Sequence, residues 1–163
     1  MRRAFIALAL LSGPAMAEAP PPPGSATWFG IHYIDTSTEG AINGIREDET
    51  ARIEMIEGYI VDALTERGFE MREPEAERVA RIKNPLHSNG ADSKIAAEMG
   101  SDYAISGEVQ KVSNLIQSVN LYIREAGTGR QLRGGAVDVR GNTDEAFQRG
   151  YSYLLRNIIF RED

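Results

Sequence analysis

Residues 103–140 read YAISGEVQKVSNLIQSVNLYIREAGTGRQLRGGAVDVR, and this stretch decides the fold. Apolar residues alternate with polar ones along three successive runs, 103–112, 115–125 and 131–140. A period of two is typical of strands that bury one face and expose the other. The turn AGTG joins the second run to the third. We therefore predict an antiparallel meander with one packed face and one solvated face, and expect Leu115 on the packed face.

The chain before the meander switches between strand-like and helix-like patterns. Residues 26–36 are rich in aromatic and β-branched residues, which predicts a strand. Residues 48–67 place isoleucines at helical spacing, and Gly68 is a suitable C-terminal stop because it adopts a left-handed conformation at little cost. Four weaker elements follow: a short strand over 69–72, a helix from Pro74 to about Ile82, a loop over 84–90 and a helix over 92–99.

The clearest helix is the last one. Asn142 is suited to cap its N-terminus, Glu145 follows three residues later, and Phe147, Tyr151 and Leu154 lie on one stripe. The predicted order is β-α-β-α-α-β-β-β-α. This order indicates a single α/β (α+β) domain over residues 26–163, with a mixed sheet that ends in the meander and helices packed on it.

The N-terminal segment is predicted to lie outside the domain. Residues 1–17 combine a basic start, an apolar run and small residues before a cut after Ala17, which is the pattern of a secretory signal peptide. Residues 18–25, EAPPPPGS, predict an extended spacer. We expect a soluble periplasmic protein without a stable membrane anchor.

Composition excludes several classes of protein. The chain has 163 residues, 18 Lys plus Arg, 24 Asp plus Glu and no cysteine. It therefore has no disulfide, no thiolate zinc site, no cysteine nucleophile and no lipidated cysteine. The net charge of -6 argues against nucleic acid as a partner.

One segment resembles a known family. The run 100–112, GSDYAISGEVQKV, is followed by a strand, Thr128-Gly129 and a further strand, and residues 35–37 and 140–145 also fit the pattern. The chain resembles a periplasmic family of unknown function in proteobacteria, some members of which are encoded beside quinoprotein alcohol dehydrogenases. It is distantly similar to the N-terminal domain of the Tol-Pal translocation protein B and to the curli-secretion lipoprotein domain. The resemblance implies an exported accessory protein and carries over no catalytic residue.

The loop after the first predicted strand partly imitates a calcium-binding loop. Asp35, Ser37 and Glu39 supply oxygen at the first, third and fifth positions, and Gly40 occupies the sixth. Arg46 stands where a bidentate glutamate is required, and a strand precedes the loop in place of a helix. We therefore expect no metal site, although the loop remains a candidate for binding a small ligand.

His32, Asp35 and Ser37 supply the residue types of a catalytic triad. His32 lies within an alternating strand, and no nucleophile-elbow glycines surround Ser37. The sequence predicts no catalytic residue and no cofactor.

The polar face of the meander is the other candidate surface. Glu108, Gln110 and Asn120 are expected on it, and its candidate binding residues are Tyr122, Arg124, Asp138 and Arg140. Mixed charges around a tyrosine suit a protein or peptide partner, and a simply solvated face is an equal alternative. Arg140 and Asn142 also precede a helix N-terminus that suits an anion, but capping by Asn142 would already satisfy its N–H groups.

Two functional hypotheses follow. The first is a non-catalytic accessory or binding module with a periplasmic protein partner, assisting a quinoprotein dehydrogenase system if the resemblance extends to gene neighbours. The alternative is a periplasmic small-ligand or metal-ion binding protein that uses the loop Asp35 to Gly40. The sequence leaves the oligomeric state open.

Overall fold

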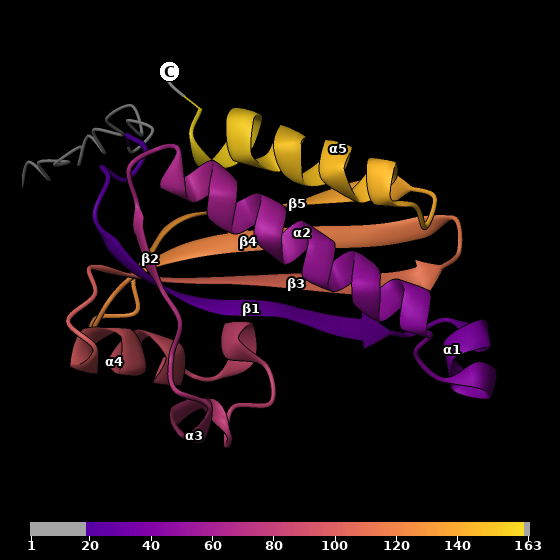
Figure 1. Cartoon of the computed structure of the whole chain (residues 1–163), viewed down its shortest axis with the longest axis horizontal. Helices are drawn as coiled ribbons and strands as arrows, with labels where there is room; N and C mark the ends of the chain where they lie inside the picture. Colours follow the sequence, from indigo (N-terminus) through magenta and orange to yellow (C-terminus); the bar gives the residue numbers. More distant parts are fainter. Residues whose placement is uncertain (1–18, 162–163) are drawn as a thin grey trace, which may run out of the picture.

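The computed structural model describes residues 19–161, so the predicted signal peptide over 1–17 lies outside the described residues. These described residues form five strands and seven helical segments (Figure 1). Their bounds are β1 Ser25–Asp35, α1 Thr38–Asn43, α2 Glu47–Thr65, β2 Glu70–Arg72, α3 Ala76–Val79, the 3-10 turn η1 Pro85–His87, α4 Ala91–Glu98, β3 Tyr103–Ser113, β4 Ile116–Glu125, β5 Gln131–Arg140, α5 Asp144–Leu154 and the π-helical turn η2 Leu155–Ile159.

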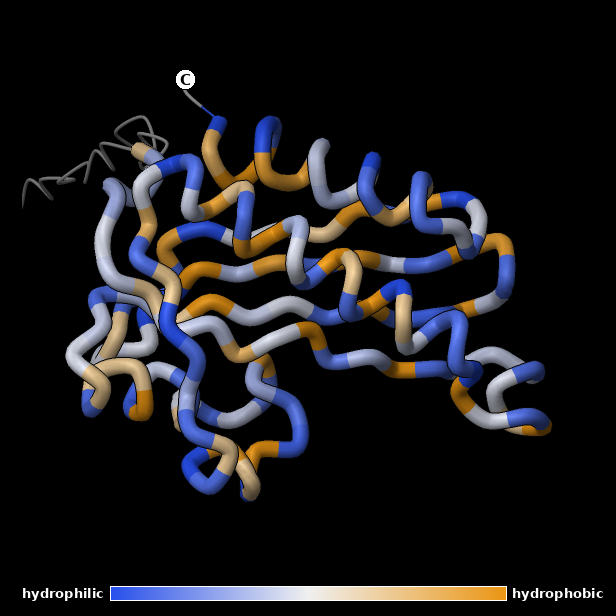
Figure 2. The backbone as a smooth tube through the Cα atoms, viewed as in Figure 1, coloured by the Kyte–Doolittle hydropathy of each residue, from blue (hydrophilic) through white to orange (hydrophobic). Residues whose placement is uncertain are grey.

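The strands form one mixed sheet in the order β2-β1-β3-β4-β5. Strand β1 runs parallel to both β2 and β3, whereas β3, β4 and β5 are joined antiparallel. The prediction of a single mixed sheet with a C-terminal meander is confirmed. Hydrophobic and hydrophilic residues alternate along the strands (Figure 2), and this alternation gives the sheet one packed face and one polar face.

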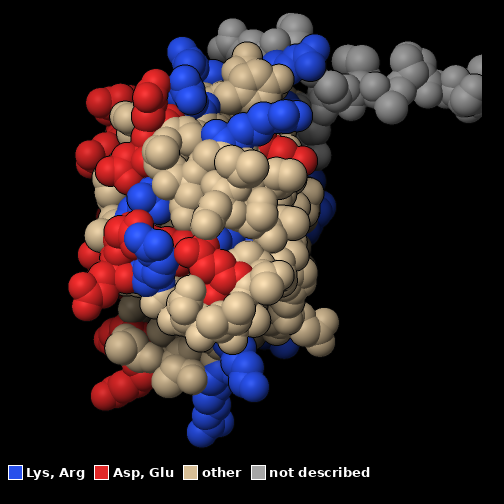
Figure 3. All heavy atoms as spheres, turned by 90° about the vertical axis from the view of Figure 1, so that its right-hand side faces the viewer, with Lys and Arg blue, Asp and Glu red and all other residues tan. Residues whose placement is uncertain are grey.

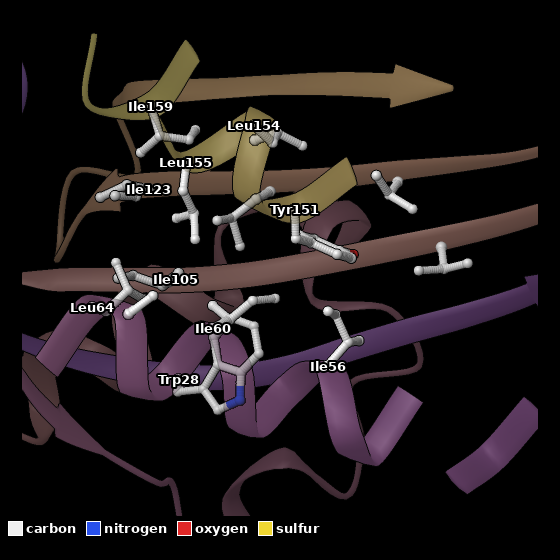
Figure 4. Close-up of a cluster of buried hydrophobic side chains, with 14 of the residues drawn as sticks. Trp28, Ile56, Ile60, Leu64, Ile105, Ile123, Tyr151, Leu154, Leu155 and Ile159 are labelled. Atoms are coloured by element: carbon white, nitrogen blue, oxygen red, sulfur yellow. The ribbon is translucent and has the colours of Figure 1, made fainter. Parts of the chain in front are cut away.

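The two faces of the sheet have different covers. Helices α2 and α5 pack on one face, and the buried side chains of both helices meet those of β1, β3 and β4 there (Figure 4). This core contains Ile56, Ile105 and Tyr151, none of which is exposed. The outer face carries α4 and η1 only over the half of the sheet where β4 passes into β5 (Figure 1). The other half of the outer face is open to solvent.

A β-bulge interrupts β1 opposite α2. The register with β3 shifts between Trp28 and Ile31, and Gly30 takes a φ of 76° there. The carboxylate of Glu57 accepts a hydrogen bond of 2.5 Å from the N–H of Ile31 that the bulge frees. Burial raises the pKa of Glu57, and the negative charges of Glu54 and Glu73 raise it further.

Several predicted details were wrong. Residues 38–43 form the short helix α1 where a loop was expected, because Ser37 caps its N-terminus by accepting from the N–H of Gly40. Thr143, and not Asn142, caps α5, since its hydroxyl accepts from the N–H of Ala146 at 3.2 Å. The helix expected from Pro74 to Ile82 is only the short α3. Leu115, expected on the packed face, lies in the turn between β3 and β4 and is exposed.

Part of the predicted proline spacer lies against the domain. Pro21 is buried, and the hydroxyl of Tyr103 donates a hydrogen bond of 2.9 Å to the carbonyl of Pro22. None of the helices within residues 19–161 is long and apolar enough to cross a membrane.

Candidate functional site

The structure distributes the predicted binding residues over separate places. Asp35, Ser37, Glu39 and Asn142 gather at the end of the sheet where β1 and β3 finish. Tyr122 and Arg124 line a pocket on the outer face. Asp138 and Arg140 lie on the edge strand β5.

The first group surrounds a residue that the sequence analysis missed, Lys111. Its side chain is 0% exposed, and its ammonium lies among three carboxylates. The Nζ atom is 2.6 Å from Oε1 of Glu49, 3.2 Å from Oδ2 of Asp35 and 3.2 Å from Oε2 of Glu39. We call Lys111 and these three acids the lysine cluster. The cluster ties together the ends of β1 and β3, helix α1 and the start of α2.

Mutual attraction keeps the lysine cluster charged. Burial alone would lower the pKa of Lys111, but hydrogen bonds to Glu49, Glu39 and Asp35 raise it overall. Burial opposes ionisation of Asp35, yet its hydrogen bonds with Ser37 and the charge of Lys111 lower the pKa of this carboxyl. The pKa of Glu39 is lowered by Lys111 and then by Asn114. At neutral pH the cluster is an ammonium among carboxylates.

Asn142 extends the lysine cluster to helix α5. Its side-chain N–H donates a hydrogen bond of 2.8 Å to Oε1 of Glu49, and its side-chain oxygen accepts a hydrogen bond of 2.7 Å from Nη1 of Arg52. Arg52 also donates 2.9 Å from Nε to Asp144 in the first turn of α5. Asn142 therefore joins two helices where a helix cap or an anion contact was expected.

Tyr33 lies near the charges of the lysine cluster. Its hydroxyl is buried, and among the described residues no group meets the geometric criteria for a hydrogen bond with it. Burial raises the pKa of Tyr33, and the negative charge of Glu49 adds to this effect. The phenol is therefore neutral and is no base at physiological pH.

The geometry also bears on the calcium-like loop. The ammonium of Lys111 occupies the space between the carboxylates of Asp35 and Glu39 that a cation would otherwise take. Arg46, at the twelfth position of the loop, is paired with Asp48 at 2.8 Å. Within residues 19–161 there is no group of three or more histidine or acidic side chains that could hold a metal ion.

The triad residues do not converge. The hydroxyl of Ser37 donates 2.6 Å to Oδ1 of Asp35. In the register between β1 and β3, His32 lies opposite Glu108 and Asp35 lies opposite Lys111. His32 and Asp35 are three residues apart along the strand, so their side chains project from opposite faces of the sheet.

The outer-face pocket is bounded by the meander and η1 and has a volume of about 280 Å³. Arg124 donates one hydrogen bond of 2.9 Å to the buried carboxylate of Asp92 and another of 3.0 Å to the carbonyl of Leu86. Glu108 accepts 2.6 Å from the amide of Asn84. These charges hold the α4 and η1 layer on the sheet, so this part of the polar face is occupied from within the chain.

The end of the molecule that holds the lysine cluster also exposes large aliphatic side chains. The exposed fractions are 76% for Ile42, 57% for Ile45, 48% for Val112, 73% for Leu115 and 46% for Ile116. We call these five residues the apolar end. Figure 3 faces this end and shows a broad uncharged surface with acidic residues gathered along one side. Several large aliphatic side chains exposed at one end of a domain make that end a candidate interaction surface.

The sequence contained signals for the missed residues. Lys111 falls in phase with Ile105 and Val109, so strand alternation places a charge on the packed face. Glu49 lies four residues before Ile53 and shares the apolar stripe of α2. Two opposite charges at core positions indicate a buried ion pair.

Comparison with known proteins gives one family match. The family model DUF3280, described as "Protein of unknown function (DUF2380)", matches residues 24–159. This agrees with the resemblance of the sequence to a family of unknown function, and it carries no information about dehydrogenases. No curated protein matches the sequence.

Several solved structures are similar to this chain at low sequence identity. The PelC dodecamer from Paraburkholderia phytofirmans is 10% identical with a TM-score of 0.51, covering 84% of this chain and 90% of that chain. The LpoB C-terminal domain from Salmonella enterica is 14% identical with a TM-score of 0.47, covering 79% and 88%. TolB from Acinetobacter baumannii is 11% identical with a TM-score of 0.43, covering 85% and 29%. At these identities the likeness concerns the fold alone.

Proposed function

The chain belongs to the DUF3280 family, whose function is unknown. We propose that it is a non-catalytic accessory module that binds a periplasmic protein through its apolar end. The observation that carries the proposal is the exposure of five large aliphatic side chains at one end of the sheet. Complete burial of a fully exposed aliphatic side chain is worth roughly 1.5–3 kcal/mol, and each of these five side chains forgoes the share that corresponds to its exposed fraction. A partner that covers this end would recover part of that free energy.

The lysine cluster supports the proposal because it fixes the surface beneath the exposed residues. Ile42 lies in α1, which Lys111 holds through Glu39, and Val112 follows Lys111 directly in β3. A surface that is ordered before binding loses less conformational entropy when a partner docks. The buried charges would thus serve the interface without contacting the partner.

The periplasm is the compartment that we propose, on the signal-peptide pattern of residues 1–17. The first partner to test is a periplasmic quinoprotein dehydrogenase, because the family that the sequence resembles includes members encoded beside such enzymes. This choice rests on the resemblance and not on the fold.

The test is capture of partners from the native periplasm by the tagged protein. We expect a protein retained by the wild type to be lost with the double variant Ile42→Glu/Leu115→Glu. The control is Met55→Glu, which places one such charge at an exposed apolar residue of α2. Circular dichroism and thermal unfolding would show that all the proteins are folded.

Equal capture by the wild type and the double variant would contradict the apolar end as the contact surface. Loss of the same protein with Met55→Glu would contradict it as well. The alternative of a metal or small-ligand site at Asp35 to Gly40 receives less support, since Lys111 already neutralises that loop. If the loop binds a metal ion, calorimetric titration with Ca²⁺ should show heat of binding. If the protein is an accessory module without a metal site, the titration should show no heat of binding.

A further inference from the structure

The two edges of the sheet differ in length. Strand β2, at one edge, has 3 residues, whereas β5, at the other, has 10. Long edge strands present unpaired backbone groups that can pair with another chain, and proteins commonly protect them with proline, charged side chains or short length. Strand β5, QLRGGAVDVR, contains no proline, and the charged side chains of its exposed part, Asp138 and Arg140, have opposite signs. Its only interruption is the register shift at its beginning, opposite Ile123 and Arg124.

The hydrogen-bond pattern identifies the backbone groups on this edge. The N–H of Gly141 donates 3.0 Å to the carbonyl of Leu115, which fixes these residues as a hydrogen-bonded pair with β4. Bonded and non-bonded pairs alternate along an antiparallel ladder. Val139 and Val137 therefore bond to β4, while the backbone groups of Ala136, Asp138 and Arg140 point away from the sheet. These last three residues are all exposed.

The space beside this edge can receive another strand. A groove of about 240 Å³ lies between β5 and α5, and its apolar lining includes Val137, Val139, Ala146 and Tyr153. Tyr153 is exposed. A strand added to β5 would place alternate side chains toward this groove.

The side chains of the edge select the incoming strand. Asp138 and Arg140 lie two residues apart, so they project from the same face of β5. Among residues 19–161 neither side chain has an ion-pair partner. If a second β5 pairs antiparallel about Val139, Asp138 of each strand lies opposite Arg140 of the other. Side chains directly opposite in such pairs are close enough to interact.

We propose that the β5 edge binds the β5 edge of a second copy of this chain, in an antiparallel two-fold pairing centred on Val139. The two symmetric pairs between Asp138 and Arg140 set the register. The backbone groups of the same residues supply the hydrogen bonds across the axis. This pairing satisfies the unpaired backbone groups of the edge and joins two sheets into one continuous sheet. Both copies use the same surface, as a two-fold interface requires. This contact is separate from the apolar end.

Charge reversal tests this register. The wild type should show a dimer mass in sedimentation equilibrium at micromolar concentration. Asp138→Arg and Arg140→Asp each place like charges opposite one another, and each should weaken dimerisation by about tenfold or more. The double variant D138R/R140D restores opposite charges and should dimerise as the wild type does. The two single variants should also form a heterodimer with each other on mixing.

The controls separate this contact from other surfaces. Ile42→Glu/Leu115→Glu should leave the dimer mass unchanged. A wild type that remains monomeric across this range would overturn the proposal, and so would a dimer that charge reversal leaves intact. Loss of the dimer with the apolar-end variant alone would also overturn it. In that case the self-contact would be at the other surface.

Discussion

The ammonium of Lys111 lies 2.6 Å from a carboxylate oxygen of Glu49, and both side chains are almost completely buried. They come from β3 and α2, elements that are otherwise joined by aliphatic contacts. A buried ion pair recovers the cost of desolvation only when further hydrogen bonds satisfy it. Here Asp35, Glu39 and Asn142 supply these contacts. The pair therefore specifies how the helix and the strand meet at this end.

Replacement of Lys111 by methionine should destabilise the protein strongly. The buried carboxylates of Asp35 and Glu49 would remain without their cation, while Glu39 would keep Arg46 at 3.6 Å, and breaking a buried pair costs about 3–5 kcal/mol. Urea unfolding at pH 7 measures this loss. Lys94→Met, at an exposed lysine of α4, is the matched control and should change stability by less than about 0.5 kcal/mol. A similar loss in both variants would contradict a special role for Lys111.

Stability should fall in acid through the lysine cluster. The pKa of Asp35 is lower in the folded protein than in the unfolded chain, so its contribution is fully present above the unfolded value of about 3.9 and is lost as the pH falls through the folded value. Glu39 acts in the same sense. The pKa of Lys111 is raised, so its contribution persists at neutral pH and is lost only in strong alkali. Asp35→Asn should flatten the acid limb of a plot of unfolding free energy against pH. An unchanged slope would show that other carboxyls cause the acid loss.

Arg124→Met should loosen the outer layer. The carboxylate of Asp92 is 0% exposed and would lose its cation, which costs about 3–5 kcal/mol. Hydrogen exchange should accelerate over residues 84–98 more than over α2. Arg149→Met, which removes an exposed pair with Glu145, is the control and should cost no more than about 1 kcal/mol. Uniform acceleration over the whole chain would instead indicate global unfolding.

Glu57→Gln should stabilise the protein at neutral pH. Burial raises the pKa of Glu57 in the folded protein. The contribution of the protonated side chain to stability is therefore fully present below the unfolded pKa of about 4.3 and is lost as the pH rises through the folded pKa. Glutamine is neutral at every pH and can still accept from the N–H of Ile31. The gain should be visible in thermal unfolding at pH 7 and vanish near pH 4. Glu77→Gln, at an exposed residue of α3, serves as the control, and a gain that is independent of pH would refute the explanation.

The meander and the last helix could be predicted from sequence because local periodicity determines them. The three runs within residues 103–140 largely alternate between apolar and polar residues, and the stripe that includes Phe147 and Tyr151 shows a helical period. Tertiary packing then needed only to select which face is buried. The predicted order of strands and helices is confirmed for the same reason.

The candidate site could be predicted only in part, because its chemistry depends on contacts distant in sequence. Asp35 and Glu39 were identified as oxygen donors, but their cation is Lys111, more than seventy residues away. Asn142 resembled a helix cap locally, yet its partner is Glu49. The apolar end was invisible for a different reason: Ile42 and Leu115 are apolar residues that sequence reasoning assigns to a loop or to the core.

The pairing of β1 inside the sheet, between β2 and β3, has a consequence for the order of folding. Strand β1 is the earliest in the chain, yet it pairs with β3, from which α1, α2, β2, α3 and α4 separate it. The hairpins β3–β4 and β4–β5 close over a few residues and can form in microseconds, whereas the pairing of β1 must close a long loop. We expect the last 60 or so residues to fold first and to act as the template on which β1 docks. A chain emerging N-terminus first would therefore carry β1 without its long partner β3, and with only the short β2 available for pairing, until the meander has followed it.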